Sequence, residues 1–166
     1  MKGENRLVGI DKKWLPDLFL GLALAIAFYV AGKIFGIVGA IAVPTLPNAI
    51  NVGEVGEFIV LVLGASVFES ILFQDIILDF FDKKIKNFPF VVAVLLSSLA
   101  FSVFHYYAYA ISLNLGIASF MSAFLVGFLL CYIRKWRGSL APVIAFHGML
   151  NFIIIFIIGK HWIVLG

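Results

Sequence analysis

Two long stretches without a charged residue constrain this chain more than any other feature of its sequence. Residues 87–133 and residues 138–159 contain no Asp, Glu, Lys or Arg. The whole chain of 166 residues is 63% apolar and 13% charged, whereas soluble domains are about 45–50% apolar and about 25% charged. A water-soluble core could not absorb that excess of apolar side chains. The sequence therefore predicts an integral membrane protein that contacts the lipid bilayer.

The apolar segments predict an all-α fold, a polytopic membrane helix bundle with about five transmembrane helices. A spanning segment must satisfy its backbone polar groups internally, and a helix needs about 20 apolar residues to cross. Residues 34–43 are short for a crossing, so they either continue the first span or form a re-entrant piece. The expected spans are residues 16–33, 58–81, 88–110, 115–133 and 139–158.

Basic residues lie in alternate connections between these expected spans. They occupy the N-terminal segment 1–15 and the connections 82–88 and 134–138, whereas 44–57 and 111–114 contain no Lys or Arg. The positive-inside rule then puts the N-terminus in the cytoplasm and the C-terminus outside, in a multi-pass protein of the cytoplasmic (cell) membrane. The net charge of +3 is for this reason no signal for nucleic acid. The expected organisation is a cytoplasmic basic segment, 1–15, and a single transmembrane domain, 16–166.

Four polar residues inside the apolar segments are the candidates for function: Glu69, His105, His147 and Asn151. Polar groups at membrane depth are costly and usually face a protein interior or a watery cavity. His147 and Asn151 are spaced i, i+4, so both project from one face of the last span. We therefore expect all four residues to converge around one water-accessible cavity.

Each of these residues also has a structural interpretation. Glu69 could be hydrogen-bonded to a neighbouring helix, and His105 could belong to an interfacial aromatic belt. His147 and Asn151 could supply hydrogen bonds between helices. The expected depths of two of these residues in the membrane also disagree. At the helical rise Glu69 lies roughly 21 Å from its nearest cytoplasmic basic residue, whereas His105 lies roughly 28 Å from Lys86.

Other polar residues of the apolar segments predict helix ends and helix contacts. Asp75 and Asp79 share a face near Lys83 and Lys84 and are expected to form a solvated or salt-bridged helix end. Three serines are expected to be small-residue contacts between helices: Ser97, Ser98 and Ser102.

Three motifs in this order resemble those of the CPBP family (CAAX protease and bacteriocin-processing, also called Abi). Its members are intramembrane endopeptidases similar to CAAX prenyl endopeptidases. The resemblance covers about residues 58–158 and includes intervals of 36 and 42 residues between the polar residues that define the motifs. The motifs are Glu69-Ser-Ile-Leu-Phe73-Gln74-Asp75, Phe101-x-x-x-His105 and His147-x-x-x-Asn151.

The resemblance implies a role for each motif residue. Glu69 and His105 would activate a water, and His147 and Asn151 would hold the oxyanion. Phe73 and Phe101, with Ser70 and Gln74, would position substrate or support the site.

The first motif departs from the family pattern, which usually reads Glu-Glu-x-x-x-Arg. Ser70 stands at the second Glu and Gln74 at the Arg. The two lost charges are opposite, so the sequence predicts that a neutral hydrogen-bonded pair replaces an ion pair. Such a replacement can cost little stability, because a buried ion pair is expensive to desolvate.

No cofactor is expected. Family members are often labelled metalloproteases, and two histidines with a glutamate could bind zinc with one open position. The sequence contains no His-Glu-x-x-His helix, however, and the single cysteine, Cys131, excludes a cysteine-based cluster. A metal-free reaction that depends on Glu69 is favoured over a zinc site.

The predicted function is an endopeptidase acting on a membrane-associated peptide or protein, with no nucleic-acid partner. The alternative is a catalytically silent relative that binds a membrane peptide, as an immunity or scaffold protein. The losses at Ser70 and Gln74 favour this alternative, and the four intact polar residues favour the enzyme. A proton or ion pathway would need a line of polar residues across the membrane, and the sequence contains one cluster.

Overall fold

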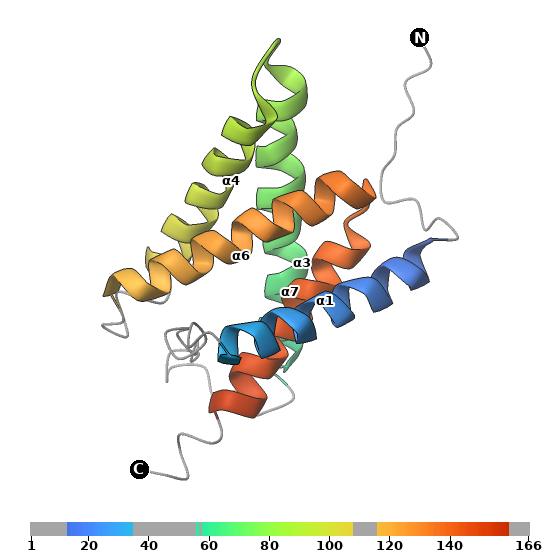
Figure 1. Ribbon diagram of the computed structural model, residues 1–166, viewed down its shortest axis with the longest axis vertical. Helices are drawn as coiled ribbons and strands as arrows, with labels where there is room; N and C mark the ends of the chain where they lie inside the picture. Colours follow the sequence, from blue (N-terminus) through green and yellow to red (C-terminus); the bar gives the residue numbers. More distant parts are fainter. Residues whose placement is uncertain (1–12, 35–55, 57, 108–115, 160–166) are drawn as a thin grey trace.

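All regular structure in the described part of the chain is helical. The computed structural model describes residues 13–34, 56, 58–107 and 116–159 (Figure 1). Within these ranges the all-α prediction is confirmed. The predicted segment 34–43 lies outside them, except for Ile34. The helices are α1 (Trp14–Ile34), a continuous helix from Phe58 to Lys84, α4 (Phe90–His105), α6 (Gly116–Arg137) and α7 (Ala141–Phe152), which η6 (Ile153–Gly159) extends.

The helix from Phe58 to Lys84 is built of wide and regular turns in alternation. The π-helical segments η2 (Phe58–Gly64) and η3 (Ser70–Ile77) flank a short α-helical segment, α3 (Ala65–Glu69), and η4 (Phe80–Lys84) ends the helix. Wide turns of this kind are frequent at functional sites. Glu69 lies at the boundary between α3 and η3.

Two predicted helix ends are wrong by about one turn, and both carry charged residues. The span predicted to end at residue 81 stays helical to Lys84, and the span predicted to end at residue 133 continues to Arg137. Lys83 and Lys84 therefore lie on a helix rather than in a connection. The same holds for three basic residues of α6: Arg134, Lys135 and Arg137. These last turns remain helical because their side chains form ion pairs with neighbouring helices.

The helices pack as two pairs linked by the helix from Phe58 to Lys84. α1 packs mainly against α7, and α4 mainly against α6, which crosses the bundle diagonally in Figure 1. A Cβ atom at Gly21 of α1 would lie 2.3 Å from the carbonyl oxygen of Pro142 and 2.8 Å from the Cβ of Ala145. Only glycine therefore permits the close approach of α1 to α7.

Aromatic and aliphatic side chains fill the centre of the bundle. Phe73, Phe101 and Phe146 are almost completely buried there. The rings of Phe73 and Phe101 meet edge to face at 5.3 Å between centroids, which is a preferred geometry for aromatic pairs. This contact joins the helix from Phe58 to Lys84 to α4, next to the residues of the candidate site.

The predicted serine contacts are present, and two of the three join helices. Ser97 of α4 donates a hydrogen bond to the carbonyl oxygen of Phe73 at 2.6 Å, and Ser102 donates to the carbonyl oxygen of Phe120 at 2.6 Å. Ser98 instead donates to Val94 of its own helix. These hydroxyls tie α4 to both of its neighbours.

The depth of His105 follows from where α4 begins. Ile85 and Pro89 have extended backbones, so the basic connection runs outside both helices and α4 starts only at Phe90. Glu69 is 15 residues from Lys84, and His105 is 15 residues from Phe90. At the α-helical rise His105 lies roughly 22 Å from the start of α4, and Glu69 lies the same number of residues from the end of its helix, which removes most of the apparent mismatch.

Two of the described helices are long and apolar enough to cross a membrane, namely Trp14–Gly32 and Phe58–Lys84. Phe90–His105 and Ala141–Phe156 are apolar but shorter. Large apolar side chains point outward from the bundle, including Phe19, Phe68 and Ile76, each more than half exposed. An outer surface of this kind suits hydrocarbon rather than water.

Candidate active site

Three of the four candidate residues meet at one point inside the bundle. Oε2 of Glu69 lies 3.4 Å from Nε2 of His105 and 3.4 Å from Nε2 of His147. The three side chains come from α3, α4 and α7, and the two imidazole rings are 6.5 Å apart between centroids. The helix bundle thus collects one carboxyl group and two imidazoles from segments that are far apart in the sequence.

Burial differs among these three residues. Glu69 is 3% exposed and His147 is 2% exposed, whereas the side chain of His105 is 22% exposed. His105 ends α4 and is the member of the group that is nearest to the surroundings of the bundle. The group is therefore most accessible from outside the bundle at His105.

The hydrogen bond of His105 to its own helix defines which ring nitrogen carries a proton. Nδ1 lies 3.0 Å from the carbonyl oxygen of Phe101. A carbonyl oxygen can only accept, so Nδ1 must be the donor. In the neutral imidazole the lone pair is then on Nε2, which faces Glu69. His105 is in this form a hydrogen-bond acceptor toward the centre of the site.

Phe101 and Phe73 support this arrangement. The ring of Phe101 lies 4.1 Å from that of His105 and 5.6 Å from that of His147, between centroids. Phe73 packs against Phe101 on the other side. Phe101 thus limits the orientations open to the two imidazoles, and Phe73 in turn holds Phe101.

Asn151 lies one turn after His147 on α7, but its amide is directed to the helix from Phe58 to Lys84. Nδ2 donates to the carbonyl oxygen of Leu61 at 3.1 Å and to Oγ of Ser66 at 3.3 Å. The backbone of Asn151 therefore lies next to the group of Glu69 and the two histidines, whereas its side-chain amide is directed to Leu61 and Ser66. These two hydrogen bonds join helices, as the structural interpretation expected.

The predicted hydrogen-bonded pair of Ser70 and Gln74 is wrong. Both side chains are fully buried, and Oγ of Ser70 and both polar atoms of the Gln74 amide have no hydrogen-bond partner among the described residues. Spacing places the two residues on adjacent turns, but η3 is a π-helix, whose wider turns change the direction of residues four apart. The first motif therefore retains buried polar groups without internal compensation.

Glu69, His105 and His147 also fit a metal ion. Their ligand atoms all lie within 4.8 Å of one another, and tetrahedral zinc separates its donors by roughly 3.3–3.4 Å. The bond from Nδ1 of His105 to a backbone carbonyl is of the kind that orients metal-binding histidines. These three residues would hold the ion, and bound zinc would supply Lewis-acid chemistry.

Ser66 and the Leu61 carbonyl were not among the predicted site residues. A serine in an apolar helix looks like any small-residue contact, and a backbone carbonyl has no sequence signature. One signal was present: Ser66 lies three residues before Glu69 and so on the same helical face.

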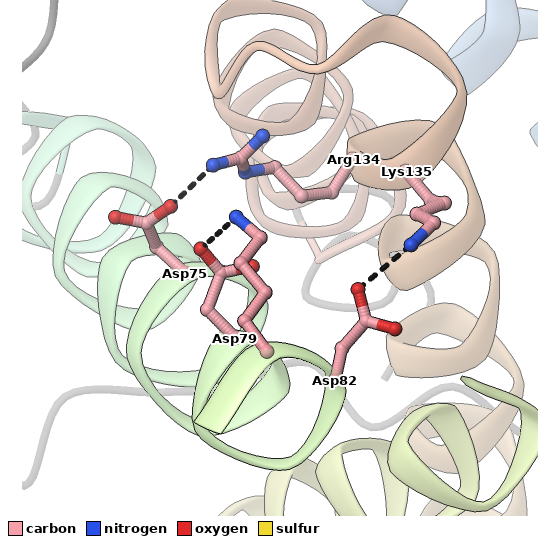
Figure 2. Close-up of polar contacts among 6 residues, drawn as sticks. Asp75, Asp79, Asp82, Arg134 and Lys135 are labelled. Carbon is pink, nitrogen blue, oxygen red and sulfur yellow. Dashed lines mark hydrogen bonds and ion pairs between the residues drawn. The ribbon is translucent and has the colours of Figure 1, made fainter. Parts of the chain in front are cut away.

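The acidic residues near the basic helix ends lie apart from this site and form an ion-pair layer, shown in part in Figure 2. Asp79 pairs with Lys83 of its own helix, as predicted, but Asp75 pairs with Arg134 of α6 at 2.5 Å. The basic residues at the end of α6 each contact a different carboxylate. These pairs are Arg134 with Asp75, Lys135 with Asp82, and Arg137 with Asp17 of α1.

Comparison with known families matches most of the chain. A family profile described as "Type II CAAX prenyl endopeptidase Rce1-like" matches residues 51–153, which include Glu69, His105, His147 and Asn151. Comparisons with curated proteins and with solved structures found no match.

Proposed function

Because this chain belongs to the Rce1-like family of type II CAAX prenyl endopeptidases, we propose that it is an intramembrane endopeptidase acting on a membrane-associated peptide or protein. The family match confirms the resemblance predicted from the three motifs. With its long apolar helices the chain is a membrane protein. The observation that carries the proposal is the convergence of Glu69, His105 and His147 from three helices.

In the proposed reaction, Glu69 and His105 hold the attacking water. The Glu69 carboxylate acts as a general base. It takes a proton from the water while the water oxygen bonds to the scissile carbonyl carbon. Nε2 of His105, with its lone pair toward Glu69, accepts the second hydrogen bond of the water. The carbon–nitrogen bond then breaks, and the protonated Glu69 returns the proton to the leaving amine.

His147 and Asn151 stabilise the oxyanion in this proposal. Both lie on one face of α7, one turn apart. Donors fixed in advance near the developing charge lower the barrier, because they need no reorganisation during the reaction. The longer of the two Asn151 hydrogen bonds, to Ser66 at 3.3 Å, involves the hydrogen that would be shared with the oxyanion while the amide keeps its orientation.

The test is cleavage of a peptide library, with prenylated and unprenylated members, by purified protein in detergent. We expect the wild type to cleave and Glu69→Gln to be slower by about 10²–10⁴-fold, because the amide cannot take the proton. Asp79→Asn, the same change in an exposed ion pair, is the matched control and should retain cleavage. Equal cleavage by wild type and Glu69→Gln, or none by either, would reject the proposal.

The proposed reaction needs no metal, and chelation tests this part separately. Dialysis of the purified protein against a strong zinc chelator should leave the rate of cleavage unchanged. Loss of cleavage that returns on addition of zinc would instead assign Glu69, His105 and His147 to a metal site.

A second candidate function is binding of a membrane peptide without cleavage. The uncompensated buried side chains of Ser70 and Gln74 favour it, because they stand where the family usually has a charged pair. A silent relative would bind members of the library with equal affinity before and after Glu69→Gln and would cleave none.

A further inference from the structure

The side-chain amide of Asn151 is held in one orientation by two acceptors on the helix from Phe58 to Lys84. Its Nδ2 donates to the carbonyl oxygen of Leu61 and to Oγ of Ser66. Because a carbonyl oxygen only accepts, the nitrogen end of the amide, and not the oxygen end, must face Leu61. The Leu61 carbonyl therefore determines which end of the amide lies against this helix.

One acceptor alone would leave the amide free to turn. The χ2 torsion of asparagine has broad minima, so the amide could swing about its hydrogen bond to Leu61. The second contact, with Ser66, removes this freedom by holding the other hydrogen of the same nitrogen. Ser66 is 1% exposed, so bulk water is not available to replace it.

The close packing of α7 on α3 keeps Ser66 within reach of Asn151. Gly148 lies between His147 and Asn151 and faces this contact, where a Cβ atom would lie 3.3 Å from the carbonyl oxygen of Val62 and 3.6 Å from Oγ of Ser66. A larger side chain at residue 148 would press the two helices apart at the height of Ser66. The glycine thus lets α7 approach closely enough for the hydrogen bond.

We propose that Ser66 is a positioning residue, whose hydroxyl orients the Asn151 amide for stabilisation of the oxyanion. The inference rests on the proposed function above. Ser66 holds the Nδ2 hydrogen in place before the substrate arrives, and the hydrogen is then shared between Oγ of Ser66 and the oxyanion without rotation of the amide. Ser66 lies one turn before Glu69, so α3 carries both the base and the residue that orients the oxyanion donor.

A serine that only joined two helices would affect folding but not the chemical step through Asn151. The two roles differ in how Ser66→Ala and Asn151→Ala combine. If Ser66 acts through Asn151, its removal has no further effect on kcat once Asn151 is gone, because effects of residues that act as a unit are not additive. A purely structural serine gives the same loss in both backgrounds.

The experiment measures kcat, KM and the unfolding midpoint for Ser66→Ala, Asn151→Ala and the double variant. Ser98→Ala is the matched control, because Ser98 is also a buried serine but donates to the carbonyl oxygen of Val94 in its own helix and makes no hydrogen bond to Asn151. We expect kcat to fall roughly 3- to 10-fold in Ser66→Ala, the usual effect of one neutral hydrogen bond, with KM nearly unchanged. Ser98→Ala should keep its kcat, and its unfolding midpoint should fall by about as much as that of Ser66→Ala.

Three outcomes are distinguishable when Glu69→Gln is measured alongside. The loss from Ser66→Ala should be present in the wild-type background and absent in the Asn151→Ala background. An unchanged kcat in Ser66→Ala, or an equal loss in both backgrounds, would overturn the role of Ser66 and leave the protease intact. If Glu69→Gln cleaves as well as the wild type, the proposed function itself fails, and the role of Ser66 fails with it.

Discussion

The ion-pair layer and the group around Glu69 differ in whether their charged and polar side chains have partners. In the layer, the carboxylates of Asp17, Asp75 and Asp82 are each paired with a cation of α6 (Figure 2 shows the last two pairs). Around Glu69, the carboxyl and imidazole groups lie 3.4 Å apart, and Oε2 of Glu69 makes no hydrogen bond among the described residues.

This difference separates polar groups that hold the bundle together from polar groups available for chemistry. A buried polar atom without a partner costs about 1–3 kcal/mol, and a role in chemistry is one reason for a protein to retain it. The layer pairs each carboxylate and gains helix packing. In the proposed function, the group around Glu69 keeps its acceptors for a water and a substrate.

The largest expected effect in either region is on the group around Glu69. We expect His147→Ala to lower kcat by roughly 10²–10³-fold, the usual loss for one oxyanion donor. Its unfolding midpoint should also fall, because the substitution leaves a cavity where the buried imidazole packs against Phe101, so kcat is measured at a temperature at which the variant is folded. Steady-state kinetics and thermal unfolding of the purified variant check this. Loss of folding in proportion to activity would contradict the contrast.

A change in the ion-pair layer should lower the stability of the protein and leave its rate of cleavage nearly unchanged. Arg134→Met keeps the apolar stem of the side chain but leaves Asp75 without its partner, which is expected to cost about 1–2 kcal/mol of unfolding free energy. The rate of cleavage should stay within about twofold of wild type, because the carboxylate of Asp75 is directed to Arg134 of α6 and not to Glu69. Denaturant unfolding in detergent and a cleavage assay give both values. A tenfold loss of kcat would link the layer to the chemistry.

The first motif offers an intermediate case. Ser70→Glu and Gln74→Arg singly bury an unpaired charge and should each destabilise the protein. In the double variant the longer Glu and Arg side chains can reach each other across the wide turn of η3, so stability should recover. We expect the double variant to keep or exceed wild-type cleavage. Unfolding midpoints of the three variants test this, and a double variant less stable than either single variant would show that the two side chains do not meet.

The smallest expected signal concerns the side of the membrane on which the ion-pair layer lies. We propose that the layer faces the cytoplasm, because basic residues gather there. Single cysteines replacing Lys84 and Trp136, in a Cys131→Ala background, should stay unlabelled by an impermeant thiol reagent in intact cells. They should become labelled after permeabilisation. Strong labelling of intact cells would invert the proposed topology.

The helices and the meeting of Glu69 with the two histidines were predictable, whereas their partners were not. The length of the apolar segments predicted the helices. The cost of isolated polar groups at membrane depth predicted that Glu69, His105 and His147 would meet. The pairing of Asp75 with Arg134 depends on the crossing of α6, which no local pattern encodes. The failed prediction for Ser70 and Gln74 has the same origin, because it assumed regular α-helical turns where η3 is wider.

The most direct test of the contrast uses the same chemical change in both regions. Glu69 and Asp17 are both buried carboxylates, 3% and 2% exposed, and Glu69→Gln and Asp17→Asn each replace one by an amide. Measured side by side, Glu69→Gln should lose cleavage and keep its unfolding midpoint. Asp17→Asn should lower the midpoint, because Arg137 loses its partner, and keep its cleavage rate at permissive temperature. If both variants lose stability and activity in parallel, the group around Glu69 is a structural contact like the layer.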